Sequence, residues 1–207
     1  MKKITLLFFL FLGITTFGQQ IYIETGKTAS SFEFKDSQGT SLENMQATTN
    51  NHLAVGFKSQ VFTKNLNLSL GLTYNSYGSI ASNQGLDNYY EWNTDYLGVN
   101  LGFDYNLFNV NKFTFYLKAA TSVEFIVQGN QIINNQIFNI VGVQEFNSAA
   151  IFLKGGAGIS YPVSEKSTLY LSYIYGKSLA LKDNLNSNES ELKIKSNMVG
   201  LGISVKL

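Results

Sequence analysis

From residue 19 onward, apolar side chains recur at every second position along the chain. In the clearest run, Leu66 to Tyr74, five apolar residues alternate with small or polar ones. On a helix these side chains would spread around the cylinder, whereas on a β-strand they form one face. The pattern therefore predicts eight strands. They begin near Ile21 and then cover residues 53–57, 66–74, 97–107, 113–127, 151–161, 169–175 and 199–207.

The connections between the predicted strands are of two kinds. Three are short and lie near residues 64–65, 109–112 and 162–167. Four are long and rich in Asn, Gln, Ser and Asp, and they cover residues 37–50, 79–92, 128–144 and 182–193. Long and short connections alternate, and the series begins and ends with a long one. This is typical of an up-and-down antiparallel barrel with four long loops at one rim and three short turns at the other.

The polar face of the predicted strands indicates the surroundings of such a barrel. Soluble β-sandwiches alternate too, but their water-exposed face usually carries Lys, Glu and Thr and few glycines. Here that face is rich in small residues such as Gly56, Ser69 and Gly71, which suit the inside of a narrow barrel. The opposite face is almost entirely aliphatic and aromatic and suits lipid. We therefore predict an all-β fold, an eight-stranded up-and-down antiparallel transmembrane β-barrel.

The first predicted strand fits this pattern least. Lys27 shares a face with Ile21 and Ile23, so it would point a charge toward lipid. We therefore expect a β-bulge that resets the register before Phe32 and Phe34.

The N-terminal residues have the pattern of a secretory signal peptide. Lys2 and Lys3 precede an apolar run over residues 4–12, and small residues follow up to Gly18. The alternative, a membrane anchor, would need about 20 apolar residues, and this run is too short. We predict cleavage between Gly18 and Gln19, which leaves a signal peptide over 1–18 and a barrel domain over 19–207.

Composition excludes several kinds of function. The chain carries 15 basic and 14 acidic residues, a net charge of +1, so it has no electrostatic footprint for nucleic acid. It has no cysteine and one histidine, which argues against a zinc site and excludes a disulfide. No phosphate-binding glycine loop precedes a helix. We expect neither a metal ion nor a cofactor.

Six charged residues fall in mid-strand on the face predicted to point inward. Three are acidic and three are basic, and a charge in a narrow lumen persists only when it is paired. Asp104 and Lys118 are equally far from Asn111, so we expect them to lie opposite one another. Because eight strands enclose little more than side chains, a plugged barrel is favoured over an ion pathway. The six residues are Glu24, Lys58, Asp104, Lys118, Glu124 and Lys154.

One predicted long loop contains a cluster of aromatic residues. Tyr89, Tyr90 and Trp92 flank the carboxylate of Glu91 within six residues. The cluster is typical of the aromatic girdle at a membrane interface. The alternative is a surface patch that binds an extracellular protein or glycan, because aromatic residues anchor such contacts.

Taken together, these features resemble the small eight-stranded outer-membrane barrels of the OmpX and OmpA-domain type, often grouped as porin family proteins. The resemblance rests on the leader, the strand count, the loop pattern and the final strand, Met198 to Leu207. That strand resembles the C-terminal signal read by the barrel-assembly machinery, although it ends in Leu rather than Phe. The resemblance implies a protein of the Gram-negative cell outer membrane, with lipid around it and the assembly machinery as a partner during biogenesis.

We therefore expect a non-enzymatic envelope protein with a structural or surface-interaction role through four long external loops. One alternative is a lipid-modifying outer-membrane enzyme. Relatives of the lipid A deacylases would carry His-x-Ser on the lipid face, whereas His52 is followed two positions later by Ala54 and faces inward. We expect His52 to be a hydrogen-bonding residue at the long-loop rim. The other alternative is a soluble secreted β-sandwich or lipocalin-like carrier.

Overall fold

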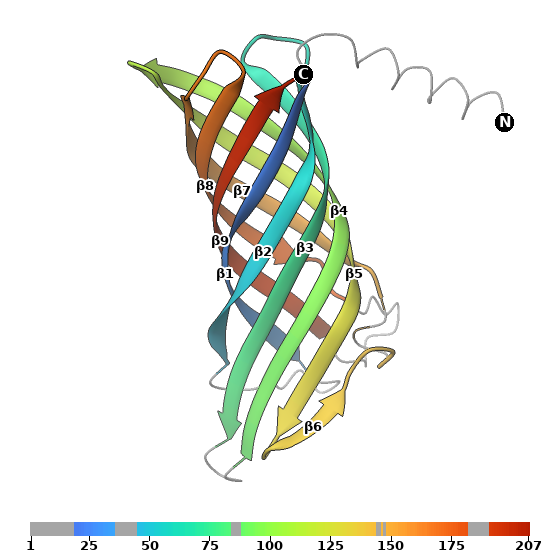
Figure 1. The fold of residues 1–207 in the computed structure, drawn as a ribbon. Helices are drawn as coiled ribbons and strands as arrows, with labels where there is room; N and C mark the ends of the chain where they lie inside the picture. Colours follow the sequence, from blue (N-terminus) through green and yellow to red (C-terminus); the bar gives the residue numbers. More distant parts are fainter. Residues whose placement is uncertain (1–18, 36–44, 84–87, 144–145, 147, 182–190) are drawn as a thin grey trace, which may run out of the picture.

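The computed structural model describes residues 19–35, 45–83, 88–143, 146, 148–181 and 191–207, and these residues form nine strands (Figure 1). Among the described residues, no helix is long and apolar enough to cross a membrane. The strands are β1 (Gln20–Lys35), β2 (Gln46–Gln60), β3 (Leu66–Asn83), β4 (Asn88–Val110), β5 (Phe113–Ile133), β6 (Gln136–Asn139), β7 (Ala150–Pro162), β8 (Ser167–Ser178) and β9 (Glu191–Lys206).

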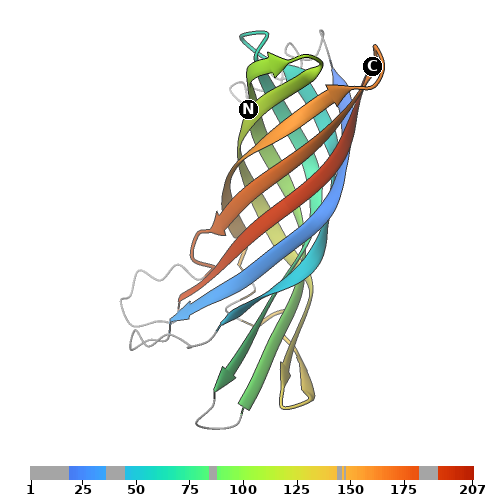
Figure 2. The same ribbon diagram turned by 90° about the vertical axis from the view of Figure 1, so that its left-hand side faces the viewer.

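Eight of these strands form a closed antiparallel barrel. Neighbours in sequence pair from β1 to β5, then β5 pairs with β7, β7 with β8 and β8 with β9. The ring closes between the first and last strands, from Gln20 opposite Lys206 to Lys35 opposite Glu191. The short strand β6 pairs only with the end of β5 and stands outside the ring (Figures 1 and 2). This confirms the predicted up-and-down barrel, and the closed sheet contradicts the soluble sandwich.

Side chains alternate between the outside and the lumen of this barrel. Outward residues such as Leu72 and Leu201 leave more than half of their surface exposed, at 55% and 58%. The glycines on the inward face make room for large neighbours: a Cβ atom at Gly158 would overlap the ring of Tyr116, and one at Gly202 that of Tyr170. Small residues therefore line the lumen because bulky tyrosines from other strands fill it, as the sequence indicates.

The strands are longer than the hydrophobic pattern predicts. β2 begins at Gln46, β3 continues to Asn83, β4 begins at Asn88 and β5 continues to Ile133. Much of the sequence assigned to long loops thus belongs to the barrel wall. In these segments both faces of a strand carry polar residues, so the period of two that identifies a strand is lost. The centres of three expected loops, residues 36–44, 84–87 and 182–190, lie outside the described residues.

The bulge predicted in the first strand is wrong. β1 pairs with β9 over its full length and with β2 from Gln20 to Ser30 without a shift in register. Lys27 does face outward, where its Nζ donates a hydrogen bond to Asn51 Oδ1 at 2.7 Å. Phe32 points inward in the unbroken register and is buried. No bulge is needed in β1, because the lumen around Phe32 is itself apolar.

Candidate functional site

The half of the lumen nearer the short turns holds a network of charged side chains from four strands. Asp104 on β4 contacts Lys58 on β2, with Oδ2 and Nζ 2.5 Å apart. Its other carboxylate oxygen lies 3.9 Å from the ammonium of Lys118 on β5, and Lys118 is also 4.0 Å from Glu24 on β1. Asp104 and Lys118 occupy opposite positions of the β4–β5 ladder, as their distance from Asn111 predicts.

A second ion pair lies further toward the long-loop end of the lumen and is more deeply buried. The ammonium of Lys154 on β7 lies 2.7 Å from Oε1 of Glu124 on β5, which is fully buried. The same carboxylate accepts hydrogen bonds from the hydroxyls of Ser122 at 2.6 Å and Tyr77 at 2.9 Å. Such extra donors are what a buried carboxylate needs to offset its lost hydration. The structure thus places all six sequence-predicted charges inside the barrel.

His52 lies in this network and not at the rim, which corrects the sequence prediction. Because β2 begins six residues earlier, at Gln46, His52 sits in mid-strand and is almost fully buried. Its Nδ1 is 3.1 Å from the hydroxyl of Thr28, and its Nε2 is 3.6 Å from Glu24. His52 therefore contacts both Glu24 and Thr28 inside the barrel, and its ring does not reach the lipid face.

Aromatic rings close the lumen around these charges. The ammonium of Lys58 lies 5.5 Å from the ring centre of Tyr116 and 5.7 Å from that of Tyr170. Between the network and the wall the structure leaves a cavity of about 40 Å³, lined in part by Thr73 and Lys154. A water molecule needs about 10–15 Å³ of such space, so the cavity fits a few waters and no hydrated ion. No group of three or more metal-binding side chains occurs among the described residues.

On the outside of the wall, a belt of polar pairs marks the end of the apolar band that is nearer the long loops. Between this belt and the short turns the outward residues are almost all Leu, Val, Ile, Phe and Tyr. Hydrogen-bonded polar groups at this level suit the boundary between hydrocarbon and headgroups. The pairs are Lys27 with Asn51, Ser76 with Asp95, and Tyr173 with Asn197.

One acidic residue beyond the belt has a perturbed pKa. Glu33 on β1 forms ion pairs with Lys177 on β8, at 2.8 Å, and with Lys195 on β9. Partial burial alone would raise the pKa of the Glu33 carboxyl, but hydrogen bonds and charge attraction from the two lysines outweigh it and lower that pKa. The three residues join neighbouring strands outside the lipid-facing band.

Inside the barrel, the lining of the lumen changes from charged to apolar toward the long-loop end. Tyr77 bonds to Glu124 through its hydroxyl, while its ring stacks on Phe152 at 5.1 Å and meets Tyr96 edge-on at 5.7 Å. These rings belong to a buried cluster that also contains Phe32 and Trp92. An aromatic layer therefore separates the ion pairs from the outer end of the barrel.

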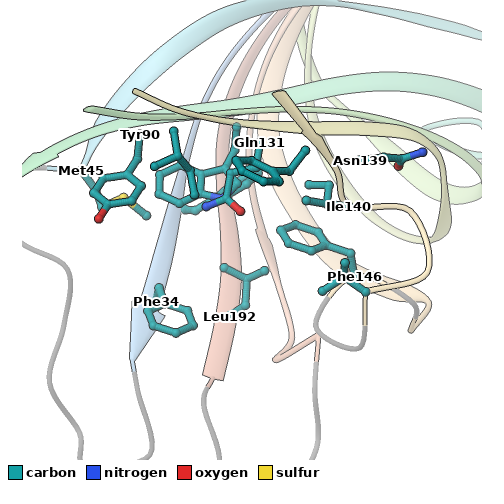
Figure 3. Close-up of a pocket in the computed structure, with 13 residues that line it drawn as sticks. Phe34, Met45, Tyr90, Gln131, Asn139, Ile140, Phe146 and Leu192 are labelled. Atoms are coloured by element: carbon teal, nitrogen blue, oxygen red, sulfur yellow. The ribbon is translucent and has the colours of Figure 1, made fainter. Parts of the chain in front are cut away.

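Beyond this layer, toward the long-loop end of the barrel, lies a partly open cavity of about 550 Å³ (Figure 3). Met45 and Tyr90 lie on one side of it and Ile140 and Phe146 on the other, with Phe34 and Leu192 facing Gln131. None of its thirteen described lining residues is charged, and only two carry an amide. They are Phe32, Phe34, Met45, Tyr90, Trp92, Gln131, Ile133, Phe138, Asn139, Ile140, Val143, Phe146 and Leu192.

The aromatic cluster at 89–92 is divided between two faces of β4 and is not a single surface patch. Tyr90 and Trp92 point inward and line the cavity, where their rings stack at 5.9 Å and 13°. Tyr89 points outward and its hydroxyl donates to Glu91 at 2.9 Å. The cluster splits because these residues lie on a strand, on which neighbouring side chains face opposite sides.

Sequence reasoning missed the cavity. Its walls come from strands far apart in the chain, from Phe146 and from the segment around Ile140, which the pattern predicts as part of the polar loop 128–144. A signal was present, because apolar residues at Ile137, Phe138 and Val143 interrupt the polar composition of that segment. The predicted processing site at Gly18 lies outside the described residues, while Gln19 accepts a backbone hydrogen bond from Leu207.

Comparison with protein families identifies the class of barrel. Residues 17–179 match a family described as the outer membrane protein beta-barrel domain. The chain belongs to this family. It is accordingly an outer-membrane β-barrel, as the sequence resemblance implies. No curated protein matches the chain.

Several solved structures of outer-membrane proteins are similar to the chain. The outer membrane protein OprG from Pseudomonas aeruginosa is 15% identical and gives a TM-score of 0.54 over 92% of this chain and 97% of its own. Neisserial surface protein A is 14% identical, with a TM-score of 0.48 over 90% and 97%. The outer membrane protease OmpT from Escherichia coli is 8% identical, with a TM-score of 0.46 over 93% and 98%. At these identities the likeness concerns the fold alone.

Proposed function

We propose that this outer-membrane barrel is a non-enzymatic envelope protein with a structural or surface-interaction role. The observation that carries the proposal is the division of the barrel into two parts. The membrane-spanning part holds paired charges and tyrosines, and the cavity among them measures about 40 Å³. The part beyond the polar belt continues the wall outward and carries the cavity and exposed apolar residues.

The surroundings of His52 favour a non-enzymatic role over lipid modification. An enzyme acting on a lipid needs its base and nucleophile on the lipid face or at an opening to it. His52 instead contacts Thr28 and Glu24 inside the filled lumen. Its neighbour two positions along, Ala54, is also buried and has no nucleophile.

The outer end of the barrel supports the surface-interaction role. Ile137 on β6 is 70% exposed, and Phe138, Val141 and Val143 are exposed nearby. Apolar residues gathered on a water-facing surface are typical of sites that contact a partner. An extracellular protein or glycan is the kind of partner that these residues and Tyr89 would suit.

Gene removal with matched complementation tests the proposal. Cells that lack the gene should become more sensitive to detergent, and the wild-type gene should restore resistance. His52→Gln, which keeps a hydrogen-bonding side chain, should restore it as well, whereas Ile137→Asp with Val141→Asp should not. Gel mobility of unheated samples verifies that each variant is folded.

Two outcomes would contradict this role. Unchanged detergent resistance in cells without the gene would oppose a structural function. Failure of folded His52→Gln to restore resistance would favour the lipid-modifying enzyme.

A further inference from the structure

We propose that the outer cavity is a binding site for a small, uncharged aromatic molecule that arrives from the external medium. The cavity measures about 550 Å³, which lies within the roughly 300–1,000 Å³ of small-molecule sites. Its lining is almost entirely apolar, with a few polar groups that would fix orientation, and this too is typical of such sites. The inference does not depend on the proposed envelope role.

The arrangement of rings favours an aromatic ligand. Tyr90 and Trp92 both line the cavity, and their rings lie nearly parallel. Phe32 is tilted against Trp92, with ring centres 6.3 Å apart, and against Phe146 at 6.2 Å. Rings at different inclinations therefore line the cavity, and aromatic rings prefer stacked or edge-to-face contacts.

The electrostatics of the cavity favour an uncharged ligand. The described charged residues next to lining residues alternate with them along the strands and so face the other side of the wall. They are Glu33 and Lys35 on β1, Glu91 on β4 and Lys193 on β9. An ion entering the cavity would lose its hydration without finding a counter-charge. Gln131 and Asn139 offer amide groups, which suit a ligand with a single hydroxyl or carbonyl.

The position of the cavity favours a ligand from the medium over a lipid chain. Phe32 lies five residues beyond Lys27 on β1, and Tyr90 lies five residues beyond Asp95 on β4. Five residues of strand span about 16 Å, which corresponds to about 12 Å along the barrel axis for strands tilted by about 40°. The cavity is therefore well outside the polar belt, and an acyl chain would have to leave the hydrocarbon layer to fill it.

The single tryptophan of the chain provides a direct assay, because Trp92 lines the cavity. The mature full-length protein is refolded into phosphatidylcholine vesicles, and Trp92 fluorescence is measured against 4-bromobenzyl alcohol, whose bromine quenches on contact. We expect saturable quenching by this alcohol. The charged analogue 4-bromobenzoate should quench at least tenfold less at equal concentration, roughly the effect of an unpaired charge.

Two neighbouring substitutions on β6 form a matched pair. Phe138 lines the cavity and is 45% exposed, whereas Ile137 is 70% exposed and does not line it. Phe138→Asp should weaken binding of the alcohol roughly tenfold or more, because it places a charge at the cavity wall. Ile137→Asp should bind like the wild type. Both side chains are exposed, so both variants should fold, which a gel-mobility shift verifies.

Several results would overturn the proposal. Quenching that rises linearly with the alcohol, or that is equal for the benzoate, would mean collision without a site. Equal binding by Phe138→Asp would place any site elsewhere. In vesicles of lipid brominated on its acyl chains, quenching of Trp92 without added alcohol would assign the cavity to a lipid chain.

Discussion

The ion pair between Glu124 and Lys154 should dominate the stability of the barrel interior. Its charged atoms are 2.7 Å apart, and Glu124 has no exposed surface. Changing Lys154→Met removes the counter-charge of this carboxylate, although the hydroxyls of Ser122 and Tyr77 still donate to it. Changing Glu124→Gln leaves the ammonium of Lys154 without a counter-charge at 2.7 Å.

The expected magnitudes follow from this geometry. Each single change should lower the free energy of unfolding by about 3–5 kcal/mol, because it leaves an unpaired buried charge. The double variant should lose much less than the sum, with a coupling energy of at least about 2 kcal/mol. Asp104 and Lys118 should be coupled by less than about 1 kcal/mol, since they are 3.9 Å apart and Asp104 retains Lys58 at 2.5 Å.

Double-mutant cycles on protein refolded into phosphatidylcholine vesicles measure both couplings. Unfolding in urea is monitored by Trp92 fluorescence and by gel mobility. The control cycle uses Asp104→Asn and Lys118→Gln. If the losses for Glu124→Gln and Lys154→Met simply add, the two side chains do not interact. If the Asp104–Lys118 coupling is the larger of the two, the distances in the lumen do not determine its energetics.

Three further predictions concern maturation, the closed sheet and the outer rim. Mass spectrometry of membrane-purified protein should show a chain that starts at Gln19, and a chain that still starts at Met1 would contradict export with cleavage. Unheated samples in detergent should migrate differently from boiled ones, because a closed sheet has no edge from which to unfold; identical mobility, with extraction into plain buffer, would contradict the barrel. In an NMR titration, the Glu33 carboxyl should have a pKa below the usual glutamate value, so its ion pairs persist at neutral pH and are lost as the pH falls through that lowered pKa. Lys195→Gln should move this pKa upward, and an unchanged titration would exclude the ion pair.

The sequence predicts the barrel well wherever the two faces of a strand meet different surroundings. Between lipid and lumen, apolar and small residues must alternate, and the register follows from parity. The turn at Asn111 and Lys112 pairs Val110 with Phe113, which alone would set Asp104 opposite Ala119. An irregularity after Asn106 shifts the register by one residue and brings Asp104 opposite Lys118. The predicted pairing is thus correct, although the bulge that produces it leaves no mark in the alternation.

The same reasoning fails where the contrast between the two faces of a strand is lost or reversed. Asn50, Asn51 and His52 are all polar, so the start of β2 is not visible in the pattern and His52 is assigned to the rim. Beyond the polar belt the outward face of the wall meets water and the inward face is apolar. Glu33 therefore points outward, between two phenylalanines that point inward. The cavity depends on tertiary contacts of this region, which a local period cannot reveal.

The filled lumen is the central claim, and electrical recording across a planar lipid bilayer tests it most directly. The wild-type barrel, with insertion verified by gel mobility, should give no stable conductance steps in concentrated potassium chloride. A variant with Tyr116→Ala and Tyr170→Ala removes two of the rings that enclose Lys58, so it should open a path and serve as the positive control. Stable steps from the wild-type protein, equal to those of this variant, would contradict a closed lumen.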